Sequence, residues 1–483
     1  MKARVLEVVL APHNRKWWTL LSVSFGLFMI MLDNTVVNVA LPSMQRALHI
    51  STSELEWVVV GYALSFATFM LTGGKLADLF GRRRLFVVGL TIFTGASLAC
   101  GLAPTAGFLI GARVVQGVGS AIMNPSTLGI ITATFPPRQR GTAIGIWAGV
   151  SAMALAIGPL VGGLLTEKVD WSWIFFINVP VGVVGVALAF WAIDESRDMS
   201  REQRLDLPGL VSSAVGLFAL TYALIEANTY GWTSGRILTL FGVAVVALSA
   251  FAVLELRQRL PMLDLHLFRN VSFSGANLSM LLVALAMFGI FFYNSLFIQN
   301  ILRFDPIQTG ATFLPMTVLI ILIAPRAGKL SDTVGPRWLI GGGLALVAAS
   351  LVLFAQLDRG SDFWNILPGL LVGGVGMAFT MTPTTAAAMG SVPVDKAGIG
   401  SAVLNSMRQV GGSLGIAVMG AVVGSEVHVG ARSPAFAGQF VSGYHHALYV
   451  ACGIAAAGAL VAVGTVRKVR HLDPTEAEAT AAA

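Results

Sequence analysis

The chain has 483 residues, of which 55% are hydrophobic and only 11% are charged. A soluble domain carries about 25% charged residues, so this chain has too little polar surface for a water-soluble globule, and most of its surface is expected to face lipid. The formal net charge is +7, but the basic residues fall in short loops between apolar runs. Membrane topology explains that pattern better than nucleic-acid binding does. The two cysteines, Cys100 and Cys452, are interpreted as small buried hydrophobes, and no metal site is predicted.

Fourteen apolar runs approach the length of about 20 residues that a helix needs to cross a bilayer. The first begins at Trp17, is longer than the apolar core of a signal peptide and has no cleavage site after it, so it is expected to be a retained span. In chain order the runs cover residues 17–40, 57–76, 85–103, 107–133, 142–165, 173–193, 207–227, 237–256, 272–298, 309–324, 338–355, 363–387, 397–423 and 441–466.

The distribution of Lys and Arg predicts the orientation. If the N-terminus is cytoplasmic and the spans alternate, only six of the 31 Lys and Arg residues lie in outer segments. Two more, Arg113 and Arg408, lie inside spans, and all the others are cytoplasmic. This asymmetry predicts that both termini are cytoplasmic.

Asp33 is an acid inside the first span, where an ionisable side chain costs a few kcal/mol and is a functional hypothesis by default. It lies 16 residues into the run, about 24 Å along a helix. Arg113 lies at a similar depth in the fourth span, so the two are expected to see each other or to share a solvated cavity. A carboxylate there can load and release a proton as the cavity opens to each side in turn. The alternative is that Asp33 is a structural hydrogen-bond acceptor and Arg113 an interhelical clamp.

A tight glycine turn follows the second span, with the sequence GKLADLFGRRRLF from Gly74. A weaker copy, GKLSDTVGPR, covers residues 328–337, which is 254 residues later and about half the chain. The repeat points to a membrane transporter made of two related halves. The turn can act as a conformational latch, in which an acid pairs with a base in one state and releases it in another. The alternative is a basic cytoplasmic anchor. The latch residues are Gly74, Asp78, Gly81 and Arg82.

The fifth span carries GPLVGG at residues 158–163. Proline removes a helix hydrogen bond and glycine removes bulk, so this segment is expected to bend and to pack closely. It is interpreted as a gate or a seal against proton leak, with a packing kink as the alternative. The residues concerned are Gly158, Pro159, Gly162 and Gly163. Three further polar residues inside spans are candidates for a substrate cavity: Asn34, Asn38 and Arg408. For Arg408 a structural role is equally open.

Six motifs together resemble one family. They are LDNTVVNVALP (32–42), GKLADLFGRRR (74–84), ARVVQGVGSAIMNP (112–125), GPLVGG (158–163), WSWIFFINVPVG (171–182) and MRQVGGSLGIAVMG (407–420). In this order they resemble the major facilitator superfamily and, within it, the fourteen-span drug:proton antiporters. By resemblance, the family's acid corresponds to Asp33 and its arginine to Arg113, with Gln116 beside it. Spans ten and thirteen lack the mid-membrane acid of some multidrug members, which leaves Asp33 as the main proton candidate.

The resemblance implies an all-α integral membrane protein with the major facilitator fold, in which two six-helix bundles and two inserted helices make 14 transmembrane helices. The expected divisions are a cytoplasmic N-terminus (1–16), an N-terminal bundle (17–193), a linker with the inserted helix pair (194–271), a C-terminal bundle (272–466) and a disordered cytoplasmic tail (467–483). The expected setting is the bacterial cytoplasmic membrane.

The expected function is efflux of amphipathic drugs or antibiotics, driven by the proton gradient through alternating access. The alternatives are a dedicated exporter of one metabolite and a non-transporting receptor or scaffold. No nucleotide-binding or metalloenzyme motif occurs, so no enzyme activity is expected. The expected partners are the bilayer, an amphipathic substrate and protons, without cofactor, metal or nucleic acid, in a monomer. Cavity candidates include Gln116 and, on span nine, Phe291, Tyr293, Asn294 and Gln299, with packing as the alternative for the aromatic residues.

Overall fold

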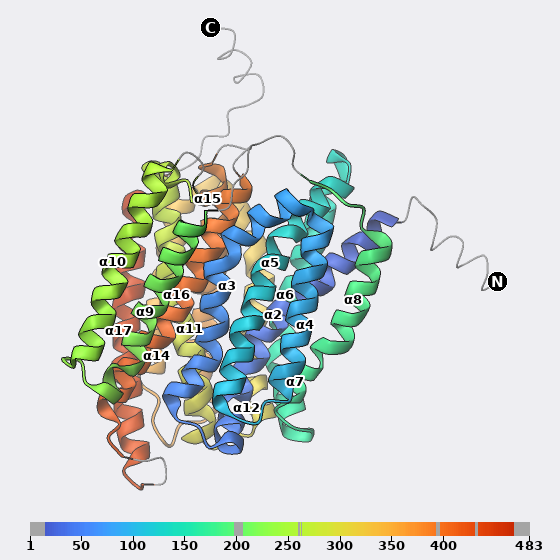
Figure 1. Ribbon diagram of the computed structural model, residues 1–483. Helices are drawn as coiled ribbons and strands as arrows, with labels where there is room; N and C mark the ends of the chain where they lie inside the picture. Colours follow the sequence, from blue (N-terminus) through green and yellow to red (C-terminus); the bar gives the residue numbers. More distant parts are fainter. Residues whose placement is uncertain are drawn as a thin grey trace.

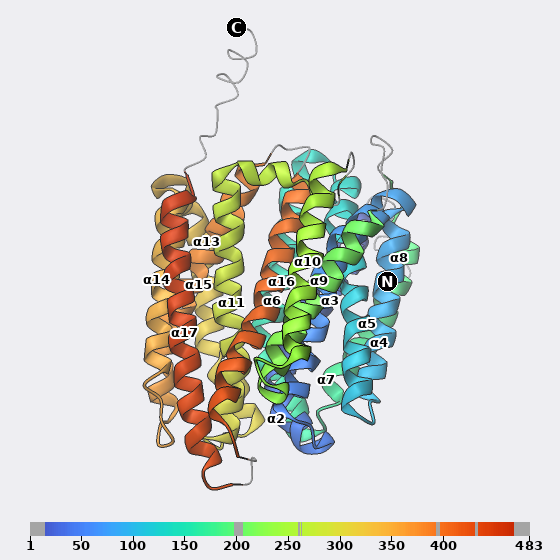
Figure 2. The same cartoon turned by 60° about the vertical axis from the view of Figure 1, so that its left-hand side comes forward.

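The computed structural model describes residues 15–197, 206–258, 261, 263–392, 397–429 and 433–467. Every regular element in these ranges is a helix (Figures 1 and 2). The sequence 1–14 and nearly all of the expected tail lie outside the described residues. The helices are α2 (Arg15–Leu48), α3 (Thr52–Phe80), α4 (Arg82–Gly101), α5 (Ala106–Thr134), α6 (Pro137–Lys168), α7 (Trp173–Phe176), α8 (Asn178–Ala192), α9 (Leu207–Tyr230), α10 (Gly235–Arg257), η2 (Leu265–Arg269), α11 (Val271–Asn300), α12 (Pro306–Thr312), α13 (Leu314–Val334), α14 (Pro336–Phe354), α15 (Phe363–Gly390), α16 (Ala397–Glu426) and α17 (Phe436–Thr465).

Thirteen helical segments of the described chain are long and apolar enough to cross a membrane, and α6 is the fourteenth when its two parts are counted as one span. Those parts, Thr142–Leu155 and Ile157–Lys168, meet at a bend of 40°. Proline cannot donate a backbone hydrogen bond to the carbonyl four residues earlier. Pro159 therefore frees the carbonyl of Leu155, the residue at which the first part ends. The fourteen expected spans agree with this count.

Two of the expected spans are each divided into two helices near one end. The apolar pattern of the sequence did not predict these breaks. The run 173–193 is divided into α7 and α8, and the tenth span is divided into α12 and α13, which extends to Val334. Pro180 lies in the first turn of α8 and Pro315 in the first turn of α13. Proline is accepted in a first turn but not in a helix interior, so each proline starts a new helix.

The helices form two groups. In the first, α2 packs on α6 and α8, and α5 packs on α3 and α4. In the second, α11 packs on α16 and α17, and α14 packs on α15 and α17. The pair α9 and α10 packs together, and α9 contacts α3 and α16, one helix of each group. We call the end at which α2 begins and α17 finishes the terminal end, and the opposite end the distal end (Figures 1 and 2).

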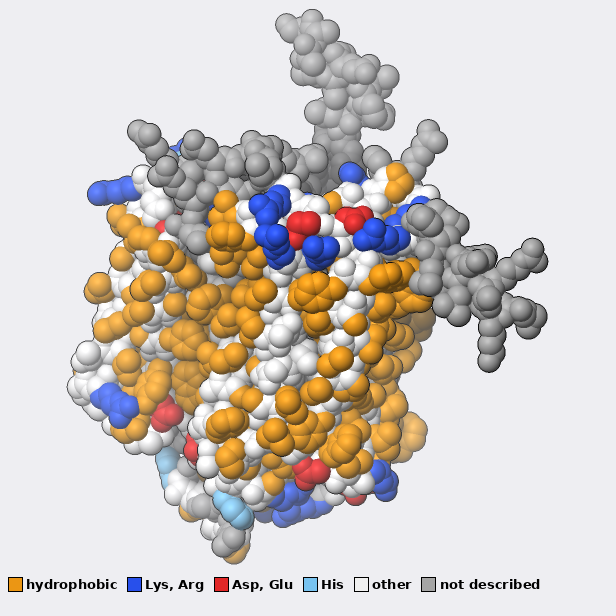
Figure 3. Space-filling model, turned by 45° about the vertical axis from the view of Figure 1, so that its right-hand side comes forward, with side chains coloured by type: hydrophobic (Ala, Val, Ile, Leu, Met, Phe, Trp, Pro, Cys, Tyr) orange, Lys and Arg blue, Asp and Glu red, His pale blue; other side chains and the backbone are white. Residues whose placement is uncertain are grey.

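The surface has the pattern of a membrane protein. An apolar band covers the middle of the molecule, and charged side chains gather at its two ends (Figure 3). Large apolar side chains are exposed along this band, including Val183, Phe190, Val246 and Leu460. Exposed apolar area of this extent is expected when lipid is the solvent. The protein is therefore a multi-pass membrane protein.

The repeated turn has the same backbone in both copies. Gly81 joins α3 to α4 with φ of 113°, and Gly335 joins α13 to α14 with φ of 94°. These values lie in a region that side-chain-bearing residues rarely adopt. The two glycines are again 254 residues apart. The internal repeat read from the sequence thus corresponds to a repeated helix–glycine–helix unit.

Candidate functional site

The structure brings Asp33 of α2 and Arg113 of α5 into direct contact. The Nη1 atom of Arg113 donates a hydrogen bond of 2.6 Å to Oδ2 of Asp33. The side chains are 1% and 0% exposed, respectively. The closely matched depths inferred from the sequence therefore correspond to a buried ion pair.

Gln116, one turn along α5 from Arg113, completes a closed triangle. Its Oε1 accepts from Arg113 Nη1 at 2.7 Å, and its Nε2 donates to Asp33 Oδ1 at 3.0 Å. The Nε of Arg113 donates to the backbone carbonyl of Val58 on α3, at 3.0 Å. Gln116 was expected to line a substrate cavity. In this conformation its side chain is fully buried and both amide ends hold the ion pair, so a cavity role for Gln116 stays a prediction.

Aromatic rings cover the guanidinium. The Cζ of Arg113 lies 4.2 Å from the ring centroid of Tyr62 and 5.7 Å from that of Phe175. The Tyr62 hydroxyl and Ser120 share a hydrogen bond of 2.9 Å, which ties α3 to α5 beside the pair. Cation–π contacts of this kind contribute about 2 kcal/mol when desolvated. The site is therefore dry, and its charges are compensated by α2, α3 and α5.

The stability of the charges at this site depends on whether Asp33 and Arg113 are paired. A buried ion pair is stable only while both partners remain, because an isolated buried charge costs several kcal/mol. If Arg113 moves away from Asp33, the carboxylate must meet water or take up a proton. A helix shift that separates α2 from α5 would therefore leave both buried charges without their partners.

The remaining cavity candidates do not contact Asp33. Asn34 and Asn38 are half-buried, and their amides donate to the backbone carbonyls of Ile30 and Asn34 in the same helix. Tyr293 and Asn294 are buried, at 2% and 3% exposure. The Tyr444 hydroxyl donates to the Asn294 Oδ1. None of the four therefore binds the ion pair, and Tyr293 and Asn294 do not line an open cavity in this conformation.

Arg408 on α16 lies across from the site in the second group of helices. It is half-buried, interacts electrostatically with Tyr62, and its Nε has no hydrogen-bond partner among the described residues. The ring of Tyr62 thus has one arginine stacked on it and a second nearby. Arg408 stays a candidate for substrate contact, since its charge is not matched by a described carboxylate.

The glycines of the fifth-span motif bring α6 into backbone contact with two other helices. A Cβ at Gly158 would lie 1.8 Å from Thr35 Oγ1, and one at Gly162 would lie 2.8 Å from the Val36 carbonyl oxygen. Both contacts are on α2 directly after Asp33. A Cβ at Gly163 would lie 2.4 Å from the Pro306 carbonyl oxygen on α12, in the second group of helices.

The two groups are joined at the distal half. Across the interface, Ser295 Oγ donates to the Asn38 carbonyl oxygen at 2.6 Å, and Gln299 Nε2 donates to that of Val39 at 2.8 Å. Gln299 is itself 4% exposed, so this expected cavity residue forms part of the contact instead. The two acceptors on α2 come shortly after Asp33 in the chain. They are close in sequence to Thr35 and Val36, which the α6 glycines contact. The structure is a conformation closed at its distal end.

The turn after α3 holds the acid–base pairing that a latch requires. Arg82 donates to Asp78 Oδ1 from Nε at 3.0 Å and from Nη2 at 2.9 Å, and its Nη1 donates to the Gly129 carbonyl at 3.2 Å. Gly81 lies against the carboxylate of Glu195, which follows α8. The backbone N–H of Arg83 donates to this carboxylate at 3.1 Å. The turn is thus fixed to α5 and to the segment after α8.

Two adjacent glycines inside α3, Gly73 and Gly74, have different surroundings and give a first test. A Cβ at Gly73 would lie 2.3 Å from the Ala121 carbonyl oxygen on α5, whereas a Cβ at Gly74 would meet only Pro125, at 3.5 Å. We expect Gly73→Ala to reduce the free energy of unfolding in detergent by about 1–3 kcal/mol. Gly74→Ala should change it by less than about 0.5 kcal/mol. Equal effects of the two substitutions would contradict this geometry.

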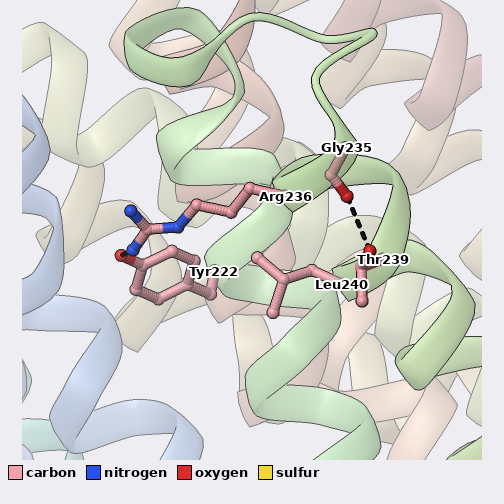
Figure 4. Close-up of a pocket in the computed structure, with 5 residues that line it drawn as sticks. All are labelled: Tyr222, Gly235, Arg236, Thr239 and Leu240. Atoms are coloured by element: carbon pink, nitrogen blue, oxygen red, sulfur yellow. Dashed lines mark hydrogen bonds between the residues drawn. The ribbon is translucent and has the colours of Figure 1, made fainter.

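Two surface hollows are lined by described residues, and neither lining includes Asp33, Arg113 or Gln116. One, of about 480 Å³, is lined by Tyr222, Gly235, Arg236, Thr239 and Leu240 at the distal end of α9 and α10. Figure 4 shows the Arg236 guanidinium beside the Tyr222 hydroxyl, to which it donates at 2.6 Å. The second, of about 330 Å³, lies between α9 and α16. Both are shallow and carry no ionisable group aimed at Asp33.

Three described acids besides Asp33 are buried, and the sequence reasoning singled out none of them: Glu56, Asp206 and Glu255. Glu56 lies one residue before the apolar run 57–76 and so outside the expected span, but in the structure it is inside α3 and only 4% exposed. Tyr293 of α11 donates to its Oε1 at 2.6 Å. A sequence signal was present, because the Ser51–Glu54 capping box starts the helix before Glu56.

The fold and this site define a membrane transporter rather than an enzyme. The family model for the Major Facilitator Superfamily matches residues 23–416. The chain belongs to the major facilitator superfamily.

Relatives and solved structures agree with this assignment. The chain is 37% identical over 406 residues to the multidrug resistance protein Stp of Mycobacterium tuberculosis (strain CDC 1551 / Oshkosh), covering 84% of this chain and 75% of Stp. It is 36% identical to the tetracenomycin C resistance and export protein of Streptomyces glaucescens, covering 86% and 77% of the two chains. A bacterial homologue of the lysosomal transporter Spinster, solved in an inward-facing and unoccupied conformation, shares the fold with a TM-score of 0.66 and 17% identity, covering 94% and 98%.

Proposed function

We propose that this protein exports amphipathic small molecules, including antibiotics, across the bacterial cytoplasmic membrane in exchange for protons, by alternating access. The observation that carries the proposal is the buried Asp33–Arg113 pair, held by Gln116 and lying directly before the residues of α2 that join the two helix groups. The names of Stp and of the tetracenomycin C protein support efflux as the direction of transport.

The proposed cycle moves a proton through Asp33. In the described conformation the pair is intact and α2 is packed against α6 and α11 near Asp33. Opening of the distal end separates these contacts and lets water reach the pair. A proton taken up there neutralises Asp33, frees Arg113, and is released after the distal end has closed again. The proton gradient drives this cycle, and it needs no cofactor or metal.

The terminal end is assigned to the cytoplasm, because it carries most of the Lys and Arg residues. The charged turn between α3 and α4 lies at this end (Figure 1), and α4 begins with Arg82, Arg83 and Arg84. Figure 3 shows Lys and Arg side chains gathered at the same end. Both chain termini are then cytoplasmic, and the distal contacts form the outer gate. The working unit is a monomer in the bilayer.

Loose recognition of apolar ligands is the expected mode of binding, since the helices offer few fixed polar groups. Arg408 is the described residue that could select for a negative or carbonyl group on the substrate. A dedicated exporter of a single metabolite remains the second candidate, favoured by the similarity to proteins named for resistance to one antibiotic.

The test is drug-triggered proton movement in proteoliposomes under an imposed pH gradient. Wild type should move protons when amphipathic drugs are added, and Asp33→Asn should lose this response, because asparagine cannot bind and release a proton. Asp194→Asn is the matched control, since Asp194 is exposed and pairs only with Arg15 among described residues. An unchanged response in Asp33→Asn would make Asp33 structural. No response with any drug would favour the single-metabolite exporter.

A further inference from the structure

Glu56 occupies the interface of the two helix groups near the distal end. It lies four residues into α3, about 6 Å along the helix. Its carboxylate accepts the hydroxyl of Tyr293 from α11 and lies against Gly420 of α16, where a Cβ would be 2.3 Å from Oε1. An acidic side chain of the first group of helices is therefore buried against two helices of the second group.

The environment of this acid does not suit a charge. Glu56 is 4% exposed, and Oε2 has no hydrogen-bond partner in the described part of the chain. Its one donor, Tyr293, is packed against Phe292 and Phe440. A carboxylate with one hydrogen bond and no cation is costly to bury, whereas a neutral carboxyl group is far less so.

The charged groups around α3 do not compensate Glu56. Another acid, Glu226 of α9, interacts unfavourably with it and accepts a hydrogen bond from Ser53. Arg113 of α5 is paired with Asp33, and Arg236 of α10 is bound to Tyr222. Arg408 of α16 interacts with Tyr62, six residues further along α3 than Glu56. No described cation forms an ion pair with Glu56.

We propose that Glu56 is a second proton-binding site, and that its protonation permits the distal gate to close. The neutral carboxyl group fits between Tyr293 and Gly420 when the two helix groups meet. The ionised form requires water and holds the groups apart. This inference rests on the alternating-access function proposed above, but Glu56 acts at the gate, whereas Asp33 carries the coupled proton.

The sign of the pH effect follows directly. A falling pH on the distal side neutralises Glu56 and favours closure, and a rising pH ionises it and favours opening. The gate would therefore close most readily when protons are abundant outside, which is when inward proton movement can drive export. Glu56 is connected to the ion pair through α3, since the Val58 carbonyl, two residues on, accepts from Arg113.

The experiment measures the distance between the two helix groups at the distal end as a function of pH. Spin labels are placed at Leu102→Cys and Trp364→Cys, which are 65% and 71% exposed, in a Cys452→Ala background that retains the buried Cys100. In nanodiscs, the closed, short-distance fraction of wild type should rise as the pH falls. Glu56→Gln, which keeps an acceptor for Tyr293, should be closed at every pH. A wild type without pH dependence, or a Glu56→Gln variant that retains it, would overturn the proposal.

Two controls make the result specific. Glu54→Gln should keep the wild-type pH dependence, because Glu54 is exposed and glutamine also completes the capping box. In infrared difference spectra of wild type minus variant, recorded at a pH at which exposed carboxylates are ionised, the carbonyl band of a protonated carboxyl group should appear for Glu56→Gln and not for Glu54→Gln. A Glu56→Gln difference spectrum without this band would mean that Glu56 is not the protonated group.

The distance measurement is independent of transport. If Asp33→Asn abolishes drug-driven proton movement but keeps the pH-dependent distance, both proposals stand. If drug-driven movement is absent from wild type while Glu56→Gln still loses its pH dependence, the antiport proposal fails and the proton-binding gate remains. If Asp33→Asn removes the pH dependence and Glu56→Gln does not, the gate proposal fails and Asp33 controls both events.

Discussion

Arg113→Met is expected to abolish transport and to lower the free energy of unfolding by about 3–5 kcal/mol, the usual cost of removing one partner of a buried ion pair. The substitution keeps a long side chain but removes the donors to Asp33, Gln116 and the Val58 carbonyl. Asp33, which is fully buried, is then left with the Gln116 amide as its one described donor. The free energy of unfolding would be measured by denaturant titration in mild detergent.

The double variant Asp33→Asn/Arg113→Met separates charge from packing. It leaves no uncompensated charge, so it should be more stable than Arg113→Met alone. Acidic buffer should recover stability in Arg113→Met, since protonating Asp33 removes the unpaired charge, and should not do so in the double variant. Arg15→Met is the surface control: the Arg15–Asp194 pair is 43% and 80% exposed and should contribute less than about 1 kcal/mol. Equal losses in Arg15→Met and Arg113→Met would contradict a special role for the buried pair.

The sequence predicted the parts of the site that depend on depth in the membrane. Asp33 and Arg113 are rare charges inside apolar runs, and counting residues along two spans was enough to place them at one level. The bend of α6 was predictable for a similar reason, because a proline within a helix removes a hydrogen bond at a known position. Both inferences use local geometry and need no knowledge of which helices are neighbours.

Two features of the site needed that knowledge. Gln116 became a cavity candidate as part of the fourth-span motif, and in this conformation Asp33 and Arg113 satisfy both ends of its amide. Glu56 was overlooked because hydropathy places it at a span boundary, and its partner Tyr293 lies 237 residues away. Depth can be read from one span alone, whereas burial between two helix groups depends on how those groups are packed in a given conformation.

The expected division at residues 1–16, 17–193, 194–271, 272–466 and 467–483 stays a prediction, as do the roles assigned to the site residues. The helix contacts nevertheless show where the inserted pair, α9 and α10, packs against the rest of the protein. Of the inserted pair, α9 packs on one helix of each group, whereas α10 packs on α9 and only a small share of it is buried. On the terminal side, Lys75 of the charged turn donates at 2.6 Å to the Pro261 carbonyl, which follows α10. Through α9 and this hydrogen bond, the inserted pair contacts both helix groups.

Closure of the distal end is expected to be sensitive to added side-chain volume at the contact between α6 and α12. A Cβ at Gly163 would lie 2.4 Å from the Pro306 carbonyl oxygen, and a Cβ at Gly310 would lie 2.1 Å from that of Pro159. These are reciprocal backbone contacts between α6 and α12, so no side-chain rotation can relieve an overlap. Inserting a methyl group at such a site costs about 1–3 kcal/mol. In the proposed cycle α6 and α12 separate when the distal end opens, so that cost is expected to fall on the closed conformation alone.

Gly163→Ala is therefore expected to lower the ratio of closed to open molecules by about 5- to 150-fold, which is the equivalent of 1–3 kcal/mol. The Leu102–Trp364 spin-label distance reports this ratio, and transport should fall with it because the cycle must pass through the closed state. Gly149→Ala, on the same helix, is the matched control, because a Cβ at Gly149 meets nothing within 4 Å. A closed fraction unchanged in Gly163→Ala would show that α6 and α12 separate without cost and that the GPLVGG motif only bends its own helix. A loss confined to Gly163→Ala would instead identify the motif as the seal between the two groups, placed on α6 where it contacts both α12 and the turn of α2 that follows Asp33.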